Sequence, residues 1–366
     1  MPRGAAAELE PRVDWLVFHL TSDCNLSCSY CYQKRRPERL ASEKAARCLE
    51  TFSEDLRPGF SLGFYGGEPL LELDTIRAIV AFIRDRPELS GKRPRYLIST
   101  NGVLLDGKTI DFFAANRFSV NLSHDGTAQE VTRPSRANSR VLESLERMTK
   151  ADGLELETNS VFTPATVGEM FGSVRFLLEK GVRRCLLSYS VTAAWSGSDI
   201  GRLAEQLREI RVYLATVYRR TRAVPVTNFA EPLRRCLFRC TAGWDRLALA
   251  DDGKLWGCRV FADFFSDRPE HPEAASYCFG PIENVSLEPS LESERVRSRY
   301  VSLSQQTFTA GGRSCGRCSR LWECSACPAA GAFSTGTVGR LPDWICGMKL
   351  AWSREIRAFR EELGLA

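Results

Sequence analysis

Short apolar runs alternate with helical repeats over the first 220 residues of the chain. Six of these runs predict β-strands: Trp15–Thr21, Ser61–Gly67, Arg95–Asn101, Phe118–His124, Leu154–Thr163 and Arg184–Val191. Between them, apolar residues return every three or four positions, which is the spacing of one helix face. Ala45, Leu49, Phe52 and Leu56 show this spacing, with Ser42 predicted as the N-cap. The pattern therefore predicts six strand–helix units, and such alternation builds a parallel sheet covered by helices.

Six units are fewer than the eight of a closed barrel, so we expect an α/β fold with an open, partial (β/α)6 TIM-type barrel. Active sites of such barrels lie at the C-terminal ends of the strands. The helical period breaks near Pro225 and Pro232, and a cysteine-rich segment follows. The expected division is an N-terminal extension (1–13), the barrel (14–222), a small cysteine-rich domain (223–349) and a C-terminal helix (350–366).

Composition narrows the class of protein. The 366 residues suit one large domain and a second one, and an apolar fraction of 43% allows a full core. No run approaches the ~18 apolar residues of a membrane span, and the N-terminus has no signal-peptide pattern, so we expect a cytoplasmic protein without a membrane partner. The net charge of +5 is mild, and its 42 arginines and 8 lysines are scattered. GC-rich codon usage accounts for that arginine excess, and we expect no nucleic-acid partner.

Fourteen cysteines against three histidines are the unusual feature of the composition. In a reducing compartment, clustered cysteines are more often metal ligands than disulfides. Cys24, Cys28 and Cys31 follow the first predicted strand at the spacing C-x3-C-x2-C. Three thiolates can hold three irons of a [4Fe–4S] cube and leave the fourth iron open, whereas a structural zinc site requires four ligands.

The stretch TSDCNLSCSYCY around these cysteines resembles the signature of the radical SAM enzymes. The resemblance implies that the open iron chelates the amino and carboxylate groups of S-adenosyl-L-methionine. It also implies that an electron from the cluster cleaves the sulfonium to give a 5′-deoxyadenosyl radical, which abstracts a hydrogen atom from the substrate. In such enzymes the cofactor carries the difficult chemistry, and the protein supplies orientation and exclusion of water.

Further motifs close the next strands, at the edge where the cysteine loop is expected. Gly66-Gly67-Glu68-Pro69 resembles the family motif that meets the methionine amino group, and Ser123-His124-Asp125-Gly126 resembles a Ser-x-Asp-Gly motif near the ribose and carboxylate. The cofactor-binding residues that the resemblance implies are Tyr30, Gly66, Gly67, Glu68, Pro69, Ser99, Asn101, Ser123, Asp125, Arg133 and Asn159. The alternative is ordinary turn chemistry, which favours serine, asparagine, aspartate and glycine. His124, at a position that is commonly apolar in the family, is either a substrate contact or a packed residue.

The remaining cysteines follow a second pattern. It runs Cys240-x12-Gly253-x4-Cys258, then Cys315-x2-Cys318-x5-Cys324-x2-Cys327, then Cys346, and resembles the SPASM domain of peptide-modifying radical SAM enzymes. One spacing departs, because two residues rather than three separate Cys324 from Cys327. The resemblance implies two auxiliary [4Fe–4S] clusters. One would use Cys240, Cys258, Cys327 and either Cys236 or Cys278, and the other Cys315, Cys318, Cys324 and Cys346.

Two C-x2-C pairs could also build a zinc ribbon without any iron. We expect the tryptophans among these cysteines to shield the metal sites from solvent: Trp244, Trp256, Trp322 and Trp344.

The resemblance implies a radical SAM maturase that forms a thioether, a C–C crosslink or a related bond in a ribosomally made peptide. Expected partners are the peptide, with a separate leader-binding protein because only about a dozen residues precede the first strand, and a reductant such as flavodoxin or ferredoxin. An enzyme like the anaerobic sulfatase maturases is one alternative, although Arg259 stands where those enzymes have an aspartate. A quinone-cofactor peptide maturase and a metal-binding interaction module without SAM cleavage are the others. No residue is predicted as a catalytic acid or base.

Overall fold

The protein is described by a computed structural model that covers residues 13–232, 238, 240–285 and 291–365. The predicted ligand Cys236 lies outside these residues. The chain forms two compact units, each assembled from distant segments. The first contains Met1–Ser22, Arg36–Leu97 and Thr241–Val301, and the second contains Asp23–Arg35, Ile98–Cys240 and Ser302–Ala366. The domain boundaries expected from the sequence stay a prediction.

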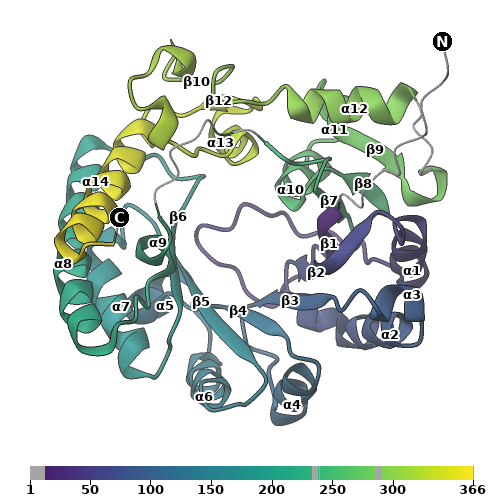
Figure 1. Ribbon diagram of the computed structural model, residues 1–366, viewed down its shortest axis with the longest axis horizontal. Coiled ribbons are helices and arrows are strands. Elements are labelled where there is room, and N and C mark those ends of the chain that lie inside the picture. The colour runs from purple at the N-terminus through teal and green to yellow at the C-terminus, as the bar shows by residue number, and fades with distance from the viewer. Residues whose placement is uncertain (1–12, 233–237, 239, 286–290, 366) are drawn as a thin grey trace. The chain divides into compact units, whose positions relative to one another are not determined.

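Strand β1 (Val13–Thr21) organises the first unit (Figure 1). It pairs in parallel with β2 (Leu56–Gly66) on one side and with β7 (Arg246–Leu249) on the other. β8 (Lys254–Trp256) and β9 (Cys278–Pro281) continue from β7 as antiparallel strands. Six consecutive residues of β1, Leu16–Thr21, are buried, which is the pattern of a parallel strand covered on both faces.

The α-helices of the first unit, among the residues described, are α1 (Ser42–Thr51), α2 (Leu73–Arg84), α3 (Pro87–Ser90), α10 (Arg259–Ser266), α11 (Ala274–Tyr277) and α12 (Leu291–Val301). The predicted first helix is present, but its N-cap is Ala41, and Ser42 is already the first helical residue. The predicted stripe continues only to Phe52, because Leu56 is the first residue of β2 rather than part of a helix.

The second unit has its own parallel strands, β4 (Ser119–Ser123), β5 (Glu155–Phe162) and β6 (Cys185–Tyr189). β3 (Arg95–Thr100) runs from the first unit into the second. A small separate sheet in the C-terminal segment joins β11 (Arg313–Ser314), β10 (Thr309–Ala310) and β12 (Arg340–Leu341). All six predicted strands are therefore present, with ends that differ from the prediction by five residues at most.

The helices of the second unit are α4 (Gly107–Ala115), α5 (Gln129–Thr132), α6 (Asn138–Met148), α7 (Met170–Glu179), α8 (Gly197–Thr221), α9 (Thr227–Ala230), α13 (Pro328–Thr335) and α14 (Ile345–Leu363). A capping box of Ser196 and Asp199 starts α8. The last helix, α14, packs along α8, and Arg211 donates to Glu355 across this contact at 3.1 Å. Leu350 of this helix is 47% exposed.

No helix in the described part of the chain combines the length and the apolar character that crossing a membrane requires.

The turn after β4 requires glycine at position 126. The backbone of Gly126 has a φ of 63°, and a Cβ there would lie 2.4 Å from the Cβ of Ser173. Gly126→Ala should destabilise the protein by about 2–5 kcal/mol, the sum of left-handed strain and overpacking. Thermal unfolding should show a clearly lower Tm. Gly201→Ala is the matched control, since open space surrounds this residue of α8. It should leave Tm unchanged or raise it, because alanine is favoured over glycine in a helix by about 1 kcal/mol. Equal Tm values for the two variants would contradict the crowding at Gly126.

Candidate functional site

The loop that carries Cys24, Cys28 and Cys31 belongs to the second unit. Cys24 and Cys28 are partly buried and Cys31 is exposed. Burial raises the pKa of the Cys28 thiol; the guanidinium of Arg133 acts in the opposite direction, and the nearby Cys31 thiol adds to the rise. The backbone N–H of Cys31 donates to the Cys28 carbonyl at 3.1 Å. The loop therefore brings at least two of its three thiols into one electrostatic environment.

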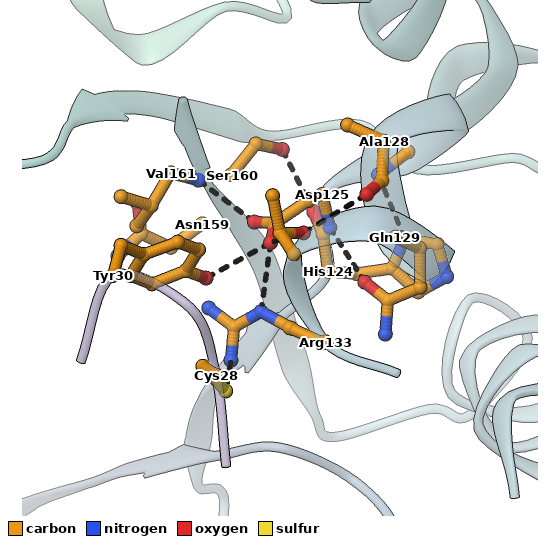
Figure 2. A network of polar contacts seen from close by, with 12 residues as sticks. Cys28, Tyr30, His124, Asp125, Ala128, Gln129, Arg133, Asn159, Ser160 and Val161 are labelled. Atoms are coloured by element: carbon orange, nitrogen blue, oxygen red, sulfur yellow. Dashed lines mark hydrogen bonds and ion pairs between the residues drawn. The ribbon is translucent and has the colours of Figure 1, made fainter. Parts of the chain in front are cut away.

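Asp125, just after β4, is the centre of the polar network beside this loop (Figure 2). Its buried carboxylate accepts hydrogen bonds from Tyr30 Oη at 2.9 Å, Thr132 Oγ1 at 2.5 Å and the Val161 backbone N–H at 2.7 Å. It also accepts from Arg133 Nε at 3.0 Å, which forms a buried ion pair. These four donors occupy the roughly four acceptor sites of the carboxylate. A buried carboxylate needs such partners, because an unpaired polar group is costly in the low-dielectric interior.

The same network fastens the cysteine loop. Arg133 Nη1 donates to Cys28 Sγ at 3.8 Å, and the backbone N–H of Ser29 donates to the Thr132 carbonyl at 3.0 Å. Burial alone would lower the pKa of Arg133, but the adjacent Asp125 carboxylate raises it above its ordinary value. Burial raises the pKa of Tyr30, with Arg133 acting against that rise and Asp125 adding to it. Arg133 is therefore a permanent cation beside a cysteine ligand candidate.

Asn101 contacts the loop at its other end. Its amide Nδ2 lies 2.7 Å from Asn25 Oδ1 and 3.7 Å from Cys24 Sγ, while its Oδ1 accepts from the Val103 backbone N–H. Asn101 directly follows β3 and Arg133 directly follows α5, so two different elements each supply a donor to one cysteine. The structure thus brings both predicted residues to the cysteine loop.

The other predicted residues of this unit lie on the strands β3, β4 and β5 or shortly after β4. Ser99 and Ser123 are half-buried in β3 and β4. Ser123 pairs with Asn159 on β5, whose side-chain oxygen accepts from Ser188 Oγ at 2.9 Å. The position of Asp125 is as predicted, but its four protein donors mean that a direct ribose contact would have to displace one of them. The cofactor roles of all these residues stay a prediction.

The motif from Gly66 to Pro69 lies in the first unit, where local geometry explains its residues. Gly66 has a φ of 149°, and a Cβ there would lie 2.3 Å from the backbone oxygen of Thr21. Gly67 donates its N–H to that same oxygen at 2.8 Å. Glu68 caps the 3₁₀ turn Pro69–Glu72 by accepting from the Leu70 N–H. The motif thus forms a tight turn against the end of β1, and only glycine fits at position 66.

Sequence reasoning missed a buried polar pair in the first unit. His19 Nδ1 of β1 lies 3.6 Å from Asp263 Oδ1 of α10, and both side chains are almost fully buried. Neither ring nitrogen of His19 has a hydrogen-bond partner among the described residues. On the same helix, the guanidinium of Arg259 lies 4.2 Å from the ring centroid of Tyr65. Only the three-dimensional structure reveals these pairs, because more than 190 residues separate β1 and β2 from α10.

A second missed feature flanks the cysteine loop in the chain. Arg36, which follows the loop, donates to Ser22 Oγ and Asp251 Oδ1 through Nη2 and to Asp267 through Nη1. Ser22, which precedes the loop, donates to Asp251 Oδ2 at 2.5 Å. Asp251 and the side chain of Asp267 are buried. We call Ser22, Arg36, Asp251 and Asp267 the loop clasp; it binds both ends of the loop to residues from the second half of the sequence.

Four cysteines of the C-terminal segment gather in the second unit. Burial raises the pKa of Cys315 to about 11, and the neighbouring thiols of Cys346, Cys324 and Cys318 add to the rise. Cys327 instead caps α13, where its Sγ accepts from the Ala330 N–H at 3.4 Å. Across the described residues, no three histidine, cysteine, aspartate or glutamate side chains are arranged to bind a single metal ion. The ligand assignment to each auxiliary cluster stays a prediction.

The other predicted ligands lie at turns and strand edges. Cys240 donates its N–H to Leu303 in the second unit, and Cys258 is the N-cap of α10 in the first. Cys278, on β9 opposite Trp256, accepts from the Gly280 N–H through Sγ at 3.4 Å. Burial raises the pKa of its thiol. The Cys278 thiol therefore already has a backbone hydrogen-bond donor.

Two tryptophans differ from the expectation that they shield metal sites. Trp322 is 56% exposed and Trp244 is also exposed, whereas Trp256 is buried.

Comparison with known proteins agrees with this geometry. Residues 18–177 match the sequence model of the radical SAM superfamily. This stretch of the chain is a radical SAM domain. Cys24, Cys28, Cys31 and the Asp125 network lie inside the matched range. The donor set fits an iron–sulfur cluster, since it offers three thiols on one loop, a buried cation beside Cys28 and an amide donor beside Cys24.

Curated relatives match only part of the chain. GTP 3′,8-cyclase 2 of Mycobacterium tuberculosis is 34% identical over 174 residues, which are 44% of this chain and 46% of that protein. The chain spans about half the length of the curated relatives it matches.

Solved structures match almost the whole chain. The structure of anSMEcpe with bound AdoMet and the Cp18Cys peptide aligns with a TM-score of 0.73 and 16% identity, over 96% of this chain and 98% of that one. Streptococcus suis SuiB bound to precursor peptide SuiA aligns with a TM-score of 0.60 and 16% identity, over 92% and 76%. At these identities the likeness shows the fold alone: the predicted α/β partial barrel followed by a cysteine-rich C-terminal segment is confirmed.

Removing the charge of Asp125 should release the cysteine loop. Asp125→Asn leaves the buried Arg133 cation unpaired, a change that costs about 3–5 kcal/mol in comparable buried pairs. Tm should fall sharply, and the reconstituted protein should lose iron first from the Cys24–Cys28–Cys31 site. Asp111→Asn is the control, because its ion pair with Arg147 is exposed and such pairs contribute little. Wild-type iron content and Tm in Asp125→Asn would contradict the role of the network.

His124 should make stability depend on pH. Burial lowers the pKa of this histidine to about 4, and its Nδ1 accepts from the Gly126 N–H at 3.0 Å, which requires an unprotonated nitrogen. The unfolded chain binds this proton below its ordinary pKa of about 6.5. The neutral side chain therefore stabilises the fold above pH 6.5, and this contribution is lost progressively as the pH falls from about 6.5 to 4.

The matched variant for this test is His124→Asn, whose side-chain oxygen can accept the same hydrogen bond but does not titrate. Its free energy of unfolding should depend less on pH between 6.5 and 4, by an amount on the order of 3 kcal/mol. Identical pH profiles for both proteins, measured by denaturant titration, would show that His124 is not held neutral.

Proposed function

We propose that this protein is a radical SAM peptide maturase with a catalytic [4Fe–4S] cluster at Cys24, Cys28 and Cys31 and two auxiliary clusters in its C-terminal segment. When bound, the first cluster and S-adenosyl-L-methionine supply a 5′-deoxyadenosyl radical that abstracts a hydrogen atom from the substrate. The chain's own part is to hold the thiols and exclude water. Tyr30, Asp125 and Arg133 do this, since Asp125 and Arg133 are buried, Tyr30 is half-buried, and their hydrogen bonds connect the loop to the residues after β4.

The observation that carries the peptide assignment is the gathering of the Cys315, Cys318, Cys324 and Cys346 thiols. Four thiolates can close an iron–sulfur cluster, and a closed cluster suits electron transfer rather than cofactor cleavage. An oxidative crosslink in a peptide removes electrons from the product radical, so an electron-accepting site inside the enzyme fits this chemistry. The whole-chain likeness in fold to anSMEcpe and SuiB, which are seen with bound peptides, supports the same conclusion.

A second auxiliary cluster would use Cys240, Cys258 and Cys327, with Cys236 as the fourth ligand. We prefer Cys236 to Cys278 because the Cys278 thiol already accepts a backbone hydrogen bond and lies on the antiparallel β8–β9 pair. A reductant such as flavodoxin or ferredoxin would supply the electron, and a separate protein would hold the peptide leader. We expect the enzyme to work in the cytoplasm.

GTP cyclisation is the second candidate, because the 34% identity to GTP 3′,8-cyclase 2 is the strongest sequence likeness among the named enzymes described above. That likeness extends over less than half of the chain. The sulfatase-maturase alternative is weaker, because Arg259 replaces the aspartate that accepts a proton in those enzymes, and a guanidinium keeps its proton. In this structure Arg259 stacks on Tyr65 instead.

Iron content and SAM cleavage test the proposal on anaerobically reconstituted protein. Three four-iron clusters correspond to about twelve irons per chain. The Cys24→Ala/Cys28→Ala/Cys31→Ala variant should hold about eight and form no 5′-deoxyadenosine under reduction. The Cys315→Ala/Cys318→Ala variant should also hold about eight but still cleave SAM, because its catalytic loop is intact. Cys185→Ala is the control; this thiol is buried in β6, and its replacement should change neither quantity.

Other outcomes decide between the alternatives. Zinc in place of iron, with no 5′-deoxyadenosine, would leave a metal-binding interaction module. Conversion of GTP to a cyclised nucleotide by the wild-type protein would favour the cyclase. A mass change in a peptide encoded beside this protein, dependent on SAM and on Cys315 and Cys318, would establish the maturase.

A further inference from the structure

Two neighbouring arginines, Arg35 and Arg36, hold the cysteine loop in different ways. Arg36 directly follows the segment Asp23–Arg35, and its Nη2 donates at 2.8 Å to Oγ of Ser22, which directly precedes that segment. The same guanidinium donates to the two carboxylates of the loop clasp at 3.0 and 3.1 Å, and these carboxylate side chains are only 0% and 4% exposed. The two ends of the loop are therefore joined to each other at a buried, charged anchor.

Arg35 turns back into the loop itself. Its Nη2 donates to the Leu26 carbonyl at 2.5 Å and to Ser27 Oγ at 2.8 Å. Leu26 is the buried apolar residue of the loop, at 8% exposure. Cys28 and Cys31 lie in the sequence between the two ends of this contact. The Arg35 side chain therefore crosses the loop and fixes the backbone on either side of two predicted ligands.

Further contacts hold the stretch between the residues that Arg35 joins. The backbone N–H of Ser29 donates to the Thr132 carbonyl at 3.0 Å. The ring of Tyr32 packs against that of Phe333 in α13, with centroids 4.5 Å apart. With the hydrogen bond from Tyr30 to the Asp125 network, these contacts give the loop protein partners along its length.

A segment without helix or strand is ordered only if its contacts outweigh the conformational entropy that ordering removes. Joining the ends of a flexible segment costs entropy, and the buried hydrogen bonds of the loop clasp offset that cost. Small metal sites without such contacts are ordered by the metal and lose their fold when it is removed. The partners of Arg35 and Arg36 described above are carbonyl, hydroxyl and carboxylate oxygens rather than thiols, so these bonds do not depend on a metal.

We infer that Arg35 and Arg36 pre-form the cysteine loop, so that its three thiols are in place before a cluster binds. Both are positioning residues, because they act on Cys24, Cys28 and Cys31 through the loop backbone. A cluster then binds to an ordered loop and does not have to fold it. Arginine suits position 36, because its planar fork donates to two carboxylates at once, whereas a lysine ammonium is a single point of charge. The inference rests on the proposed cluster at these thiols.

The first test removes the cluster and keeps the loop. In the full chain carrying Cys24→Ala, Cys28→Ala and Cys31→Ala, hydrogen–deuterium exchange of the loop amides is measured by mass spectrometry. The loop should stay as protected as in the reconstituted wild-type protein. Adding Arg35→Met to this chain should raise exchange in the loop about tenfold, because a charged hydrogen-bond donor is lost and the loop opens more often. Exchange in β5 and the Tm should stay unchanged, whereas a general loss of stability would alter both.

The second test measures how fast the first site takes up its cluster in chains with all cysteines present. During reconstitution, samples are reduced, and the first cluster is identified as the one whose EPR signal changes when SAM is added. Arg35→Met and Arg36→Lys should acquire this signal about two- to fivefold more slowly than wild type, because fewer molecules hold the thiols in place at any moment. The final signal should reach the wild-type intensity.

The variants are chosen to separate loop order from charge and folding. Arg36→Lys keeps a cation beside the buried carboxylates, so no buried charge is left without a partner. Arg84→Met is the control for loss of an arginine, because Arg84 forms an exposed ion pair with Asp85 outside the loop. It should match wild type in loop exchange and in the rate of cluster uptake.

Two results would overturn the inference. One is rapid exchange throughout the loop of the chain that lacks its three cysteines but keeps both arginines, because the cluster would then be what orders the loop. The other is loop exchange and cluster uptake that are the same in Arg35→Met, Arg36→Lys and wild type. A wild-type chain that takes up no iron at the first site would instead refute the proposed function, and the exchange measurement on the cysteine-free loop would still report whether the arginines order it.

Discussion

The buried ion pair of Asp125 and Arg133 is the interaction on which the conformation of the cysteine loop depends. The loop has no helix or strand of its own, so its conformation must come from contacts made elsewhere in the fold. Asp125 accepts from Tyr30 of the loop and from the Val161 N–H, while Arg133 reaches Cys28. One carboxylate therefore connects a strand end, the neighbouring strand and a thiol. Such a pair contributes little net stability by itself, because both charges are desolvated, but removing either partner leaves the other charge buried without compensation. Because either partner alone is costly, conformations of the loop that separate Asp125 from Arg133 are disfavoured.

The two halves of the sequence are interleaved in the fold. Residues Thr241–Val301 belong to the same compact unit as β1 and β2, and Ser302–Ala366 to the unit that contains β4, β5 and β6. β7 extends the parallel pairing of β1, and α14 packs along α8. The loop clasp also joins the two halves of the sequence, because Arg36 donates to Asp251 and Asp267 from the second half. The cysteine-rich half is therefore part of the same compact units as the first half, not a separate domain added after them. It supplies strands, a covering helix and charge partners to structure that begins near the N-terminus.

The local pattern of apolar and polar residues was enough to predict the strands. Contacts between residues far apart in the sequence could not be predicted from it. A strand such as β5 is recognisable because burial and turn residues leave a short-range imprint on the sequence, and motif spacing indicated Cys24, Cys28 and Cys31 in the same way. Asn101 could be placed at the end of a strand and Arg133 a few residues after another, but their contacts with Cys24 and Cys28 join residues 77 and 105 positions apart. The His19–Asp263 pair left no signal, since a histidine in a strand and an aspartate in a helix are each unremarkable alone. The expectation that Trp322 shields a metal site was different, because it rested on residue type alone. Large apolar side chains are usually buried, and the exposure of Trp322 is visible only in the structure.

The two groups of thiols differ in what surrounds them, and this difference has a physical meaning. Beside Cys28 the cation is Arg133, which is buried, ion-paired and so insensitive to salt. Around Cys318 the cations are exposed arginines, whose field is screened by the solvent and reaches outward. A buried charge adjusts the group next to it permanently, whereas exposed charges mainly steer approaching partners. A site that must exclude water during radical chemistry needs the first arrangement, and a site that must exchange electrons with a passing carrier needs the second. The chain provides one of each, which supports the proposal of hydrogen abstraction at the first cysteine loop and electron transfer at the C-terminal cysteines.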